Sequence, residues 1–429
     1  MKESKLYTKK GYYNPSFFQM KIDANCDLTN LNNIAPAPFS TFIHEYIHFI
    51  QDTTSTFGLV NANIIGNRLK HYVKEVEINY GPSFPVSVPI AKDHVTQINR
   101  NLQQVYMGQG QLIPDAMNPS DVKIESVNLV ETSLYLPSPL AKFLDELEVN
   151  FLFSGNSYKY KFGAIGIMET MANFIQKKHF PATSAPAIPY NSAELVAQYL
   201  YPEIGNNAEF VFALCDVCLL DYHPGRAFFR TLDLMNKKCF KPTTAEEIYE
   251  FAKTEIKGEK GESLNELFEK VSIEAESLYS EIFISPIFVN EQKWLSVLLS
   301  SARNLRLTNP TFMLNLYRQP SAKSINLANL LESLGTPLMF NRNEQAFFIP
   351  PNSLIDILIM PDRLSALLEM FRLFDDAQKN CRLSDYCSQA ITIDERCKSE
   401  PWLRSTDKNL CAYAQFWRTW NLTGKSPEK

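Results

Sequence analysis

The chain has 429 residues, of which 45% are hydrophobic and 21% are charged, and its net charge is -5. This length suffices for two or three domains with a sizeable core, and the scattered Lys and Arg residues argue against binding to nucleic acid or an anionic membrane. The N-terminus lacks the apolar run of a signal peptide, and no stretch reaches the roughly 18 apolar residues of a membrane span. We therefore expect a cytoplasmic protein, and eight irregularly spaced cysteines fit that reducing compartment.

In chain order, the first third of the sequence mixes strand and helix patterns. Short apolar and β-branched runs predict strands over 17–22, 83–90 and 122–136. Helical spacing predicts helices over 38–55 and 59–79, and the first of these contains two of the six histidines. We expect only one strand ahead of these histidines.

From residue 139 onward helical spacing dominates. The stretch 162–176 is apolar almost all round, and the charged stretch 244–283 predicts two exposed helices broken at Gly258–Gly261. Residues 336–351 predict a hairpin that turns at 341–343.

These patterns together predict an α+β fold that is mainly helical. We expect a small sheet beside the histidine helix and a helical C-terminal part. Soft boundaries divide the chain into a metal-binding catalytic region 1–235, a helical region 236–330 and a C-terminal α/β region 331–429.

The helix predicted over 38–55 carries a narrow polar stripe on an otherwise apolar surface. Apolar side chains cover most of its circumference, which is typical of a buried helix. The polar residues recur at intervals of three and four: Thr41, His44, Glu45, His48, Gln51, Asp52 and Ser55. Unpaired buried polar groups are costly, so this stripe requires hydrogen-bond partners or a metal.

Within the stripe, His44-Glu45-Tyr46-Ile47-His48 has the H-E-x-x-H spacing of a hydrolytic zinc site. Residues four apart lie on one helix face, so both imidazoles can reach one ion. Zinc lowers the pKa of a water toward about 7, and Glu45 lies where it can take that proton and pass it to a leaving group. The pattern predicts His44 and His48 as zinc ligands and Glu45 as general base. The alternative is two hydrogen-bonded histidines on a core helix.

The third ligand must come from elsewhere in the chain. A metzincin would have Gly and His where this chain has Gln51 and Thr54, and a di-iron site would need a second Glu-x-x-His, which the sequence lacks. Glu169 is the only charged residue between Lys161 and Lys177, in a helix that is otherwise apolar. This isolation makes Glu169 the favoured ligand. The alternative is a buried ion pair of Glu169 with Arg or Lys.

Two further polar residues accompany Glu169 at helical spacing, Asn173 and Gln176, so a second narrow stripe could face the first across a metal. Asn173, and Asp52 from the first helix, would each accept a hydrogen bond from a histidine ring N–H. Glu146 and Glu148 look exposed and are weaker candidates for the third ligand.

The motif HEYIH, followed at a distance by an E-T-M-A helix, resembles the gluzincin branch of the zincin metallopeptidases. This resemblance implies a zincin-like core, a zinc ion held by His44, His48 and Glu169, Glu45 as general base, and a polypeptide substrate. It also implies that Asn173 stands where thermolysin-like enzymes have an acidic residue. It covers about a tenth of the chain, and the substrate-binding sheet would have to be completed by residues 80–136.

Hydrolysis at zinc also needs a donor for the developing oxyanion. The segment 215–226 offers Tyr222 and His223 at a helix end broken by Pro224-Gly225. Either could serve as donor, and the alternative is an ordinary helix-terminating turn.

Half of the cysteines fall within the C-terminal segment CRLSDYCSQAITIDERCKSEPWLRSTDKNLC. Four thiolates in such a loop-rich stretch could close a second, structural zinc site, but free packed thiols and disulfides are alternatives. The residues are Cys381, Cys387, Cys397 and Cys411.

The residues predict metal-assisted hydrolysis, and the resemblance implies a zinc-dependent metallopeptidase that hydrolyses peptide bonds. Two other functions stay open. The chain could be a helical binding or scaffold protein with a structural or degenerate metal site, or a zinc hydrolase acting on a non-peptide amide or ester.

Overall fold

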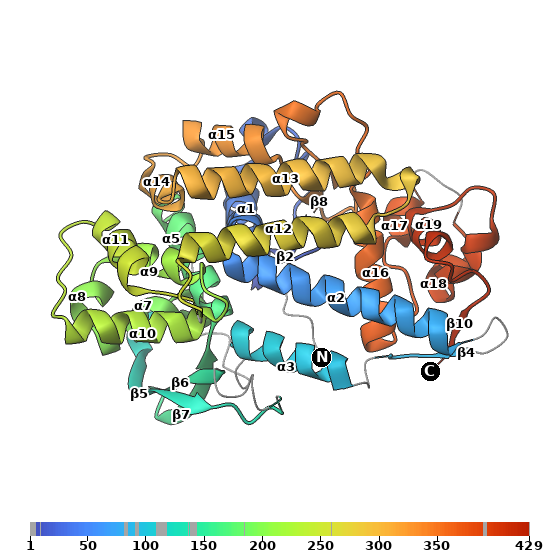
Figure 1. Cartoon of the computed structure of the whole chain (residues 1–429). Helices are drawn as coiled ribbons and strands as arrows, with labels where there is room; N and C mark the ends of the chain where they lie inside the picture. Colours follow the sequence, from blue (N-terminus) through green and yellow to red (C-terminus); the bar gives the residue numbers. More distant parts are fainter. Residues whose placement is uncertain are drawn as a thin grey trace.

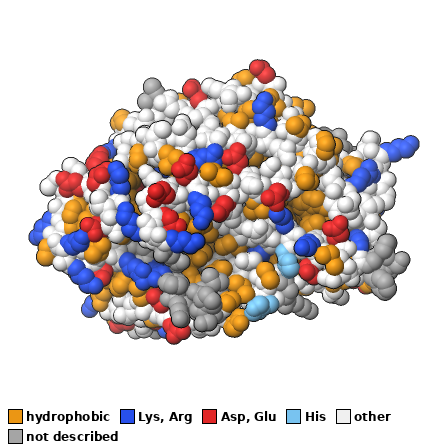
Figure 2. Space-filling view, in the orientation of Figure 1, with side chains coloured by type: hydrophobic (Ala, Val, Ile, Leu, Met, Phe, Trp, Pro, Cys, Tyr) orange, Lys and Arg blue, Asp and Glu red, His pale blue; other side chains and the backbone are white. Residues whose placement is uncertain are grey.

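The computed structural model describes residues 6–428 except for 9, 81–84, 91–93, 109–117, 136, 138–143, 184, 259 and 389–392. The architecture is mainly helical with small sheets, which confirms the predicted α+β class (Figure 1). Acidic and basic side chains are interspersed on the face shown in Figure 2.

The histidine helix α1 (Pro36–Thr54) is followed almost directly by α2 (Thr56–Asn79). Proline in the first turn of α1 fits there because that position needs no N–H donor. Ser55 separates the two helices, and its side chain accepts a hydrogen bond from the Gly58 N–H at the start of α2. A Cβ on Gly58 would lie 2.3 Å from the carbonyl oxygen of Asp52, so only glycine permits this sharp connection.

The charged stretch 244–283 forms α11 (Glu246–Glu255) and α12 (Leu264–Ile282), as predicted. A capping box between Ser263 and Glu266 starts α12. The expectation that both helices are exposed is wrong, because one face of α11 packs on α9 (Ala208–Cys218), and one face of α12 packs on α2 and on α13 (Val289–Thr308). The buried residues of that face include Leu267, Phe268, Val271 and Ala275. Figure 1 shows α2, α12 and α13 as long neighbouring helices.

Five short strands form the sheet that lies beside α1. The sheet has the order β1-β2-β3-β8-β9, and its strands are antiparallel except for the parallel pair β3–β8. Their bounds are β1 (Leu6–Thr8), β2 (Gly11–Asn14), β3 (Gln19–Ile22), β8 (Leu338–Phe340) and β9 (Ala346–Phe347). In the described residues the sheet beside α1 is thus completed by residues 338–347 and not by 80–136, and the expectation of a single early strand is wrong.

A second sheet contains β5 (Val122–Glu131), β6 (Asp145–Phe153) and β7 (Asn156–Phe162), all antiparallel. β5 confirms the strand predicted over 122–136, whereas the helical pattern expected from residue 139 is wrong for β6 and β7. Leu147, Val149 and Phe151 alternate inward along β6 as a strand requires. Glu146 is 4% exposed and pairs with Lys161 at 2.6 Å, so its expected exposure is also wrong. A third, parallel pair joins β4 (Pro85–Ser87) to β10 (Ser426–Glu428).

The remaining helices pack around these elements. They are α3 (His94–Met107), α5 (Ala164–His179), α6 (Ala187–Tyr190), α7 (Ser192–Leu200), α8 (Pro202–Gly205), α9 (Ala208–Cys218), α10 (Pro224–Lys237), α14 (Phe312–Arg318), α15 (Ile325–Leu334), α16 (Asp362–Asp376), α17 (Ser384–Cys387), α18 (Glu395–Ser399) and α19 (Ala412–Thr419). Among the described residues, no helix combines the length and the apolar character that crossing a membrane requires.

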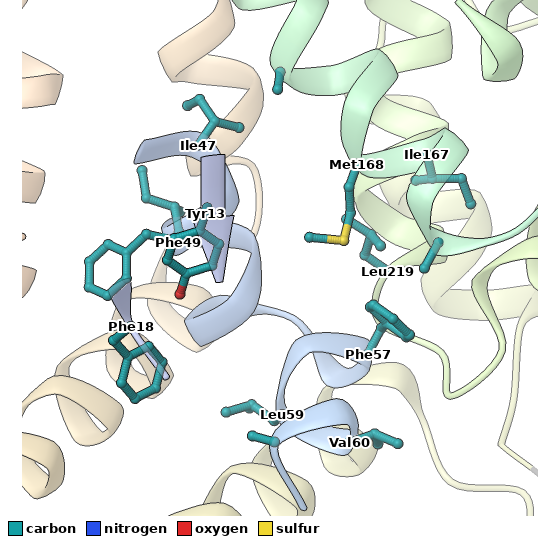
Figure 3. Packing of buried hydrophobic residues seen from close by; sticks show 14 of the residues in the cluster. Tyr13, Phe18, Ile47, Phe49, Phe57, Leu59, Val60, Ile167, Met168 and Leu219 are labelled. Carbon is teal, nitrogen blue, oxygen red and sulfur yellow. The ribbon is translucent and has the colours of Figure 1, made fainter. Parts of the chain in front are cut away.

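One large cluster of buried hydrophobic residues runs from Tyr13 to Leu422 and includes residues of all three regions expected from the sequence. Figure 3 shows part of it around α1: the rings of Tyr13, Phe18 and Phe49 lie together on the sheet side, and Met168 comes from α5. The histidine helix is therefore packed between the sheet and α5.

Candidate metal centre

His44 and His48 of α1 converge on Glu169 of α5. The Nε2 atoms of the two histidines are 3.2 Å apart, and they lie 3.0 Å (His44) and 3.5 Å (His48) from Oε2 of Glu169. All three side chains are buried, with exposed fractions of 0–1%. Among the described residues, these three make up the one group of His, Cys, Asp and Glu side chains whose ligand atoms lie close enough together to hold a metal ion.

The spacing of these three atoms fits a metal ion. Ligands about 2.0–2.1 Å from a tetrahedral zinc are about 3.3 Å from one another, close to the three distances observed. Two imidazoles and one carboxylate are also ligands that zinc commonly has in catalytic sites. The alternative of an ion pair with Lys or Arg is not formed, because in the described chain Glu169 makes ion pairs only with the two histidines.

Gln51 fixes the orientation of the His48 ring. Its Nε2 donates hydrogen bonds to the carbonyl oxygen of Met168 and to Sδ of Met171, so its Oε1 is the atom that faces Nδ1 of His48, at 2.9 Å. An amide oxygen can only accept, so Nδ1 carries the proton and Nε2 offers its lone pair to the centre. This is the tautomer that a metal ligand requires.

The protonation states of the other two groups suit a metal ligand as well. Burial lowers the pKa of His44, with Glu169 opposing this shift, so the imidazole is neutral at pH 7. Burial by itself would raise the pKa of Glu169, but the neighbouring His48 and His44 outweigh it and lower the pKa to about 2. Neutral imidazole and ionised carboxylate are the forms that bind a metal.

Glu45 lies beside the three ligands, under strand β2. It is fully buried, and Oε1 is 3.4 Å from the position that a Cβ on Gly11 would occupy. That Cβ would also lie 2.6 Å from Cγ2 of Thr41 and 2.7 Å from the carbonyl oxygen of Lys21. Glycine at position 11 therefore allows β2 to lie directly against the stripe face of α1.

Tyr190 is a residue of this centre that the sequence did not reveal. Its ring lies 5.8 Å from the ring of His44, and its side chain is 6% exposed. Burial and the negative charges of Glu169 and Glu45 raise the pKa of Tyr190, so its hydroxyl group stays protonated and can donate a hydrogen bond. Burial and Glu169 likewise raise the pKa of Tyr160 on β7. No spacing rule connects either tyrosine to the H-E-x-x-H motif.

In the described structure, neither Asn173 nor Asp52 accepts the expected hydrogen bond from a histidine ring N–H. Asn173 donates instead to the carbonyl oxygen of Tyr190 at 2.9 Å, and so holds α6 against α5. Asp52 accepts from the Tyr13 hydroxyl and the Ser16 N–H, because one turn beyond His48 the helix faces the N-terminal strands. Burial raises the pKa of Asp52 to about 7, with both hydrogen bonds opposing this shift.

The imidazole of His223, at the start of α10, is hydrogen-bonded to the backbone through both ring nitrogens. Its Nε2 donates to the carbonyl oxygen of Asp145 at 2.8 Å, and its Nδ1 accepts from the Arg226 N–H. Burial lowers the pKa of His223 to about 4, so the ring stays neutral. Both ring nitrogens are engaged away from the three ligands. Tyr222 is half-buried in the same connection between α9 and α10.

The four C-terminal cysteines gather in one part of the fold as free thiols: Cys381, Cys387, Cys397 and Cys411. Burial raises the pKa of three of them, Cys381, Cys387 and Cys411. Their sulfur atoms are not within the mutual distances of a metal site, since His44, His48 and Glu169 form the one such group in the described chain. Instead, Nη1 of Arg404 donates to Sγ of Cys397 at 3.1 Å.

No family model, no curated protein and no solved structure matches this chain. The centre is a buried pair of histidines and a glutamate that could hold a metal ion, and Glu45 is next to His44 in the sequence.

Proposed function

We propose that the protein is a zinc-dependent hydrolase that cleaves peptide bonds and resembles the gluzincins. The observation that carries this proposal is the convergence of His44, His48 and Glu169 to within 3.5 Å of one another, with Glu45 next along the helix. A structural zinc site needs no extra carboxylate beside its ligands, whereas a hydrolytic site needs a base there.

When bound, zinc would lower the pKa of a water toward about 7 and polarise the substrate carbonyl. Glu45 would accept a proton from that water and deliver it to the leaving amine. Tyr190, protonated and next to His44, would donate a hydrogen bond to the oxygen that becomes negative. We prefer it to Tyr222 because its ring lies 5.8 Å from the ring of His44, and to His223 because both ring nitrogens of His223 are already used by the backbone.

A polypeptide substrate is supported by the sheet beside the centre. Strand β2 lies against Glu45, and an extended peptide can pair with a strand edge through its main chain, whatever its side chains. The burial of the centre favours a second candidate, a hydrolase for small amides or esters, since a closed pocket admits small molecules more easily than peptides.

Metal analysis of three purified proteins tests the proposal: wild type, Glu45→Gln and Glu169→Ala. We expect one zinc per chain in the wild type and in Glu45→Gln, with peptide hydrolysis reduced at least about 1,000-fold in Glu45→Gln, because the base is lost and the ligands stay. Glu169→Ala should lose its zinc. Iron in place of zinc, or zinc retained unchanged in Glu169→Ala, would refute the assignment.

Tyr190→Phe separates the oxyanion role from a structural one. Loss of one oxyanion donor costs about 100-fold to 1,000-fold in kcat, and we expect that loss with KM and zinc content little changed. Tyr222→Phe is the matched control and should keep the wild-type kcat. If Tyr222→Phe loses kcat and Tyr190→Phe does not, the two residues have been assigned the wrong way round. Activity toward small esters but not peptides would favour the second candidate.

A further inference from the structure

The centre is closed to substrate in the structure described here. His44, Glu45, His48 and Glu169 are each 0–1% exposed. A hydrolase must admit at least the scissile bond to such residues, so one of the elements around them has to move. The elements of the surrounding fold differ in how firmly they are held, and this difference points to the one that moves.

The order of elements around α1 indicates on which side of β2 the strand β1 lies. Successive residues of a helix are rotated by about 100° about its axis. Measured about the axis of α1 from His44, Glu45 therefore lies at about 100°, Phe49 at about 140° and Tyr46 at about 200°. Glu45 faces Gly11 of β2, Phe49 packs on Phe18 at the start of β3, and the Tyr46 hydroxyl donates to the carbonyl oxygen of Gly335 just before β8.

The strands β2, β3 and β8 therefore lie at increasing angles from His44 around α1. Because β1 pairs with the other edge of β2, it extends the sheet toward His44 and the opposite helix, α5. An extended peptide that reached the metal along the sheet would have to pair with that same edge of β2. The edge is already taken by residues of the chain itself.

We propose that β1 occupies the binding position of an extended polypeptide substrate on β2, and that the centre opens when β1 leaves the sheet. This inference rests on the proposed function and specifies how its substrate binds. β1 pairs with β2 at only three positions, Leu6 with Tyr13, Tyr7 with Tyr12 and Thr8 with Gly11, and it is the terminal edge strand of its sheet. Such a strand is the least costly element to displace.

The alternatives are held more firmly. Strand β2 is tied to α1 by Tyr13, and β3 continues into the parallel pair with β8. Helix α6 is bound to α5 by the hydrogen bond from Asn173 to Tyr190. Displacing any of these would break the hydrogen bonds or strand pairing just described, whereas the main-chain pairing that β1 loses would be replaced by the substrate main chain.

A protein lacking residues 2–8 tests the proposal by peptide binding, which does not depend on the metal. The probe is a fluorescently labelled peptide with the sequence of residues 3–9, ESKLYTK, followed by fluorescence anisotropy. We expect it to bind the truncated protein and to bind the full chain at least tenfold more weakly, because the full chain occupies its own site. The control peptide has proline in place of the tyrosine, and it should bind neither protein. Equal binding to both proteins, or none to either, would overturn the proposal.

A second variant keeps the chain complete, in case the truncated protein does not fold. Tyr7 and Tyr12 are directly opposite in the β1–β2 pair, so Tyr7→Cys/Tyr12→Cys can form a disulfide that locks β1 in place. After oxidation with diamide we expect peptide hydrolysis at least tenfold lower than after reduction, with Tyr7→Cys alone unaffected by either treatment.

The outcomes separate the two proposals. If the oxidised and reduced forms hydrolyse peptides equally while zinc is present, the role of β1 is wrong and the proposed function stands. If neither form contains zinc or hydrolyses peptides, the proposed function fails, and the binding of the labelled peptide still decides whether the edge of β2 is a peptide site.

Discussion

Gln51 shows how a single side chain can prepare a metal centre. Its amide is fixed by two acceptors on α5, and it therefore presents only an oxygen to His48. The proton of the imidazole is held on Nδ1 whether or not a metal is bound. Groups of this kind typically change metal affinity by a factor of about 10 to 100 when they are removed.

We therefore expect Gln51→Leu to weaken zinc binding by about 10-fold to 100-fold, because Nδ1 of His48 loses its acceptor and the ring loses its fixed orientation. Competition with a chromogenic chelator measures the affinity. Gln51→Glu, which keeps an acceptor oxygen at the same position, is the matched control and should bind zinc at least as tightly as the wild type. Unchanged affinity in Gln51→Leu would contradict the role assigned to this residue.

The sequence predicted His44, His48 and Glu169 as ligands because each depends on a pattern that can be read along one helix. The histidines are four residues apart, and Glu169 is the lone charge in an apolar stretch. Tyr190 follows no such pattern. It reaches the centre because the chain after α5 turns back, so that Asn173 of α5 binds the carbonyl oxygen of Tyr190.

At the scale of elements, the packing of β2 against α1 depends on Gly11. Gly11→Ala would place a Cβ within 2.7 Å of Thr41 and of the Lys21 carbonyl oxygen. We expect a loss of about 1–3 kcal/mol in the free energy of unfolding, as for other overpacked sites, measured by urea denaturation. Adding Thr41→Ser removes the methyl group at 2.6 Å and should recover part of this loss. No recovery in the double variant would show that the backbone contact with Lys21 dominates.

The elements that the sequence missed are strands. β6 and β7 lie in a charged stretch that was assigned to helix, although Leu147, Val149 and Phe151 alternate inward. Glu146 is also buried, through its ion pair with Lys161, so a charged residue stands next to the inward-facing Leu147. This charged residue obscures the alternation in the sequence. The partner of β3 could not be predicted either, since β8 lies near the other end of the chain.

At the scale of the whole molecule, Arg306 of α13 joins three other parts of the fold. It forms a bidentate ion pair with Asp216 of α9 and donates to the carbonyl oxygen of Thr54 at the end of α1, and the Tyr249 hydroxyl of α11 completes the group. Both charged residues are buried. The pair therefore links elements on both sides of the boundary expected near residue 235.

We expect Asp216→Asn to lower the free energy of unfolding by about 3–5 kcal/mol, because it leaves the buried charge of Arg306 uncompensated. The loss should appear as a shift of one cooperative transition, since the buried cluster extends through all three regions. Asp233→Asn removes the exposed partner of Lys237 and is the control, with an expected change below about 0.5 kcal/mol. Separate transitions in urea would indicate that the regions unfold independently.

The pairing of β3 with β8 also has a consequence for synthesis. Gln19 pairs with Leu338, so the ribosome must produce about four-fifths of the 429-residue chain before the edge of β3 is covered. At 5–20 residues per second this delay is on the order of tens of seconds. During that time the nascent β2–β3 hairpin exposes an unpaired strand edge, which is a template for aggregation. Folding in the cell should therefore depend on a chaperone that protects the emerging N-terminal hairpin.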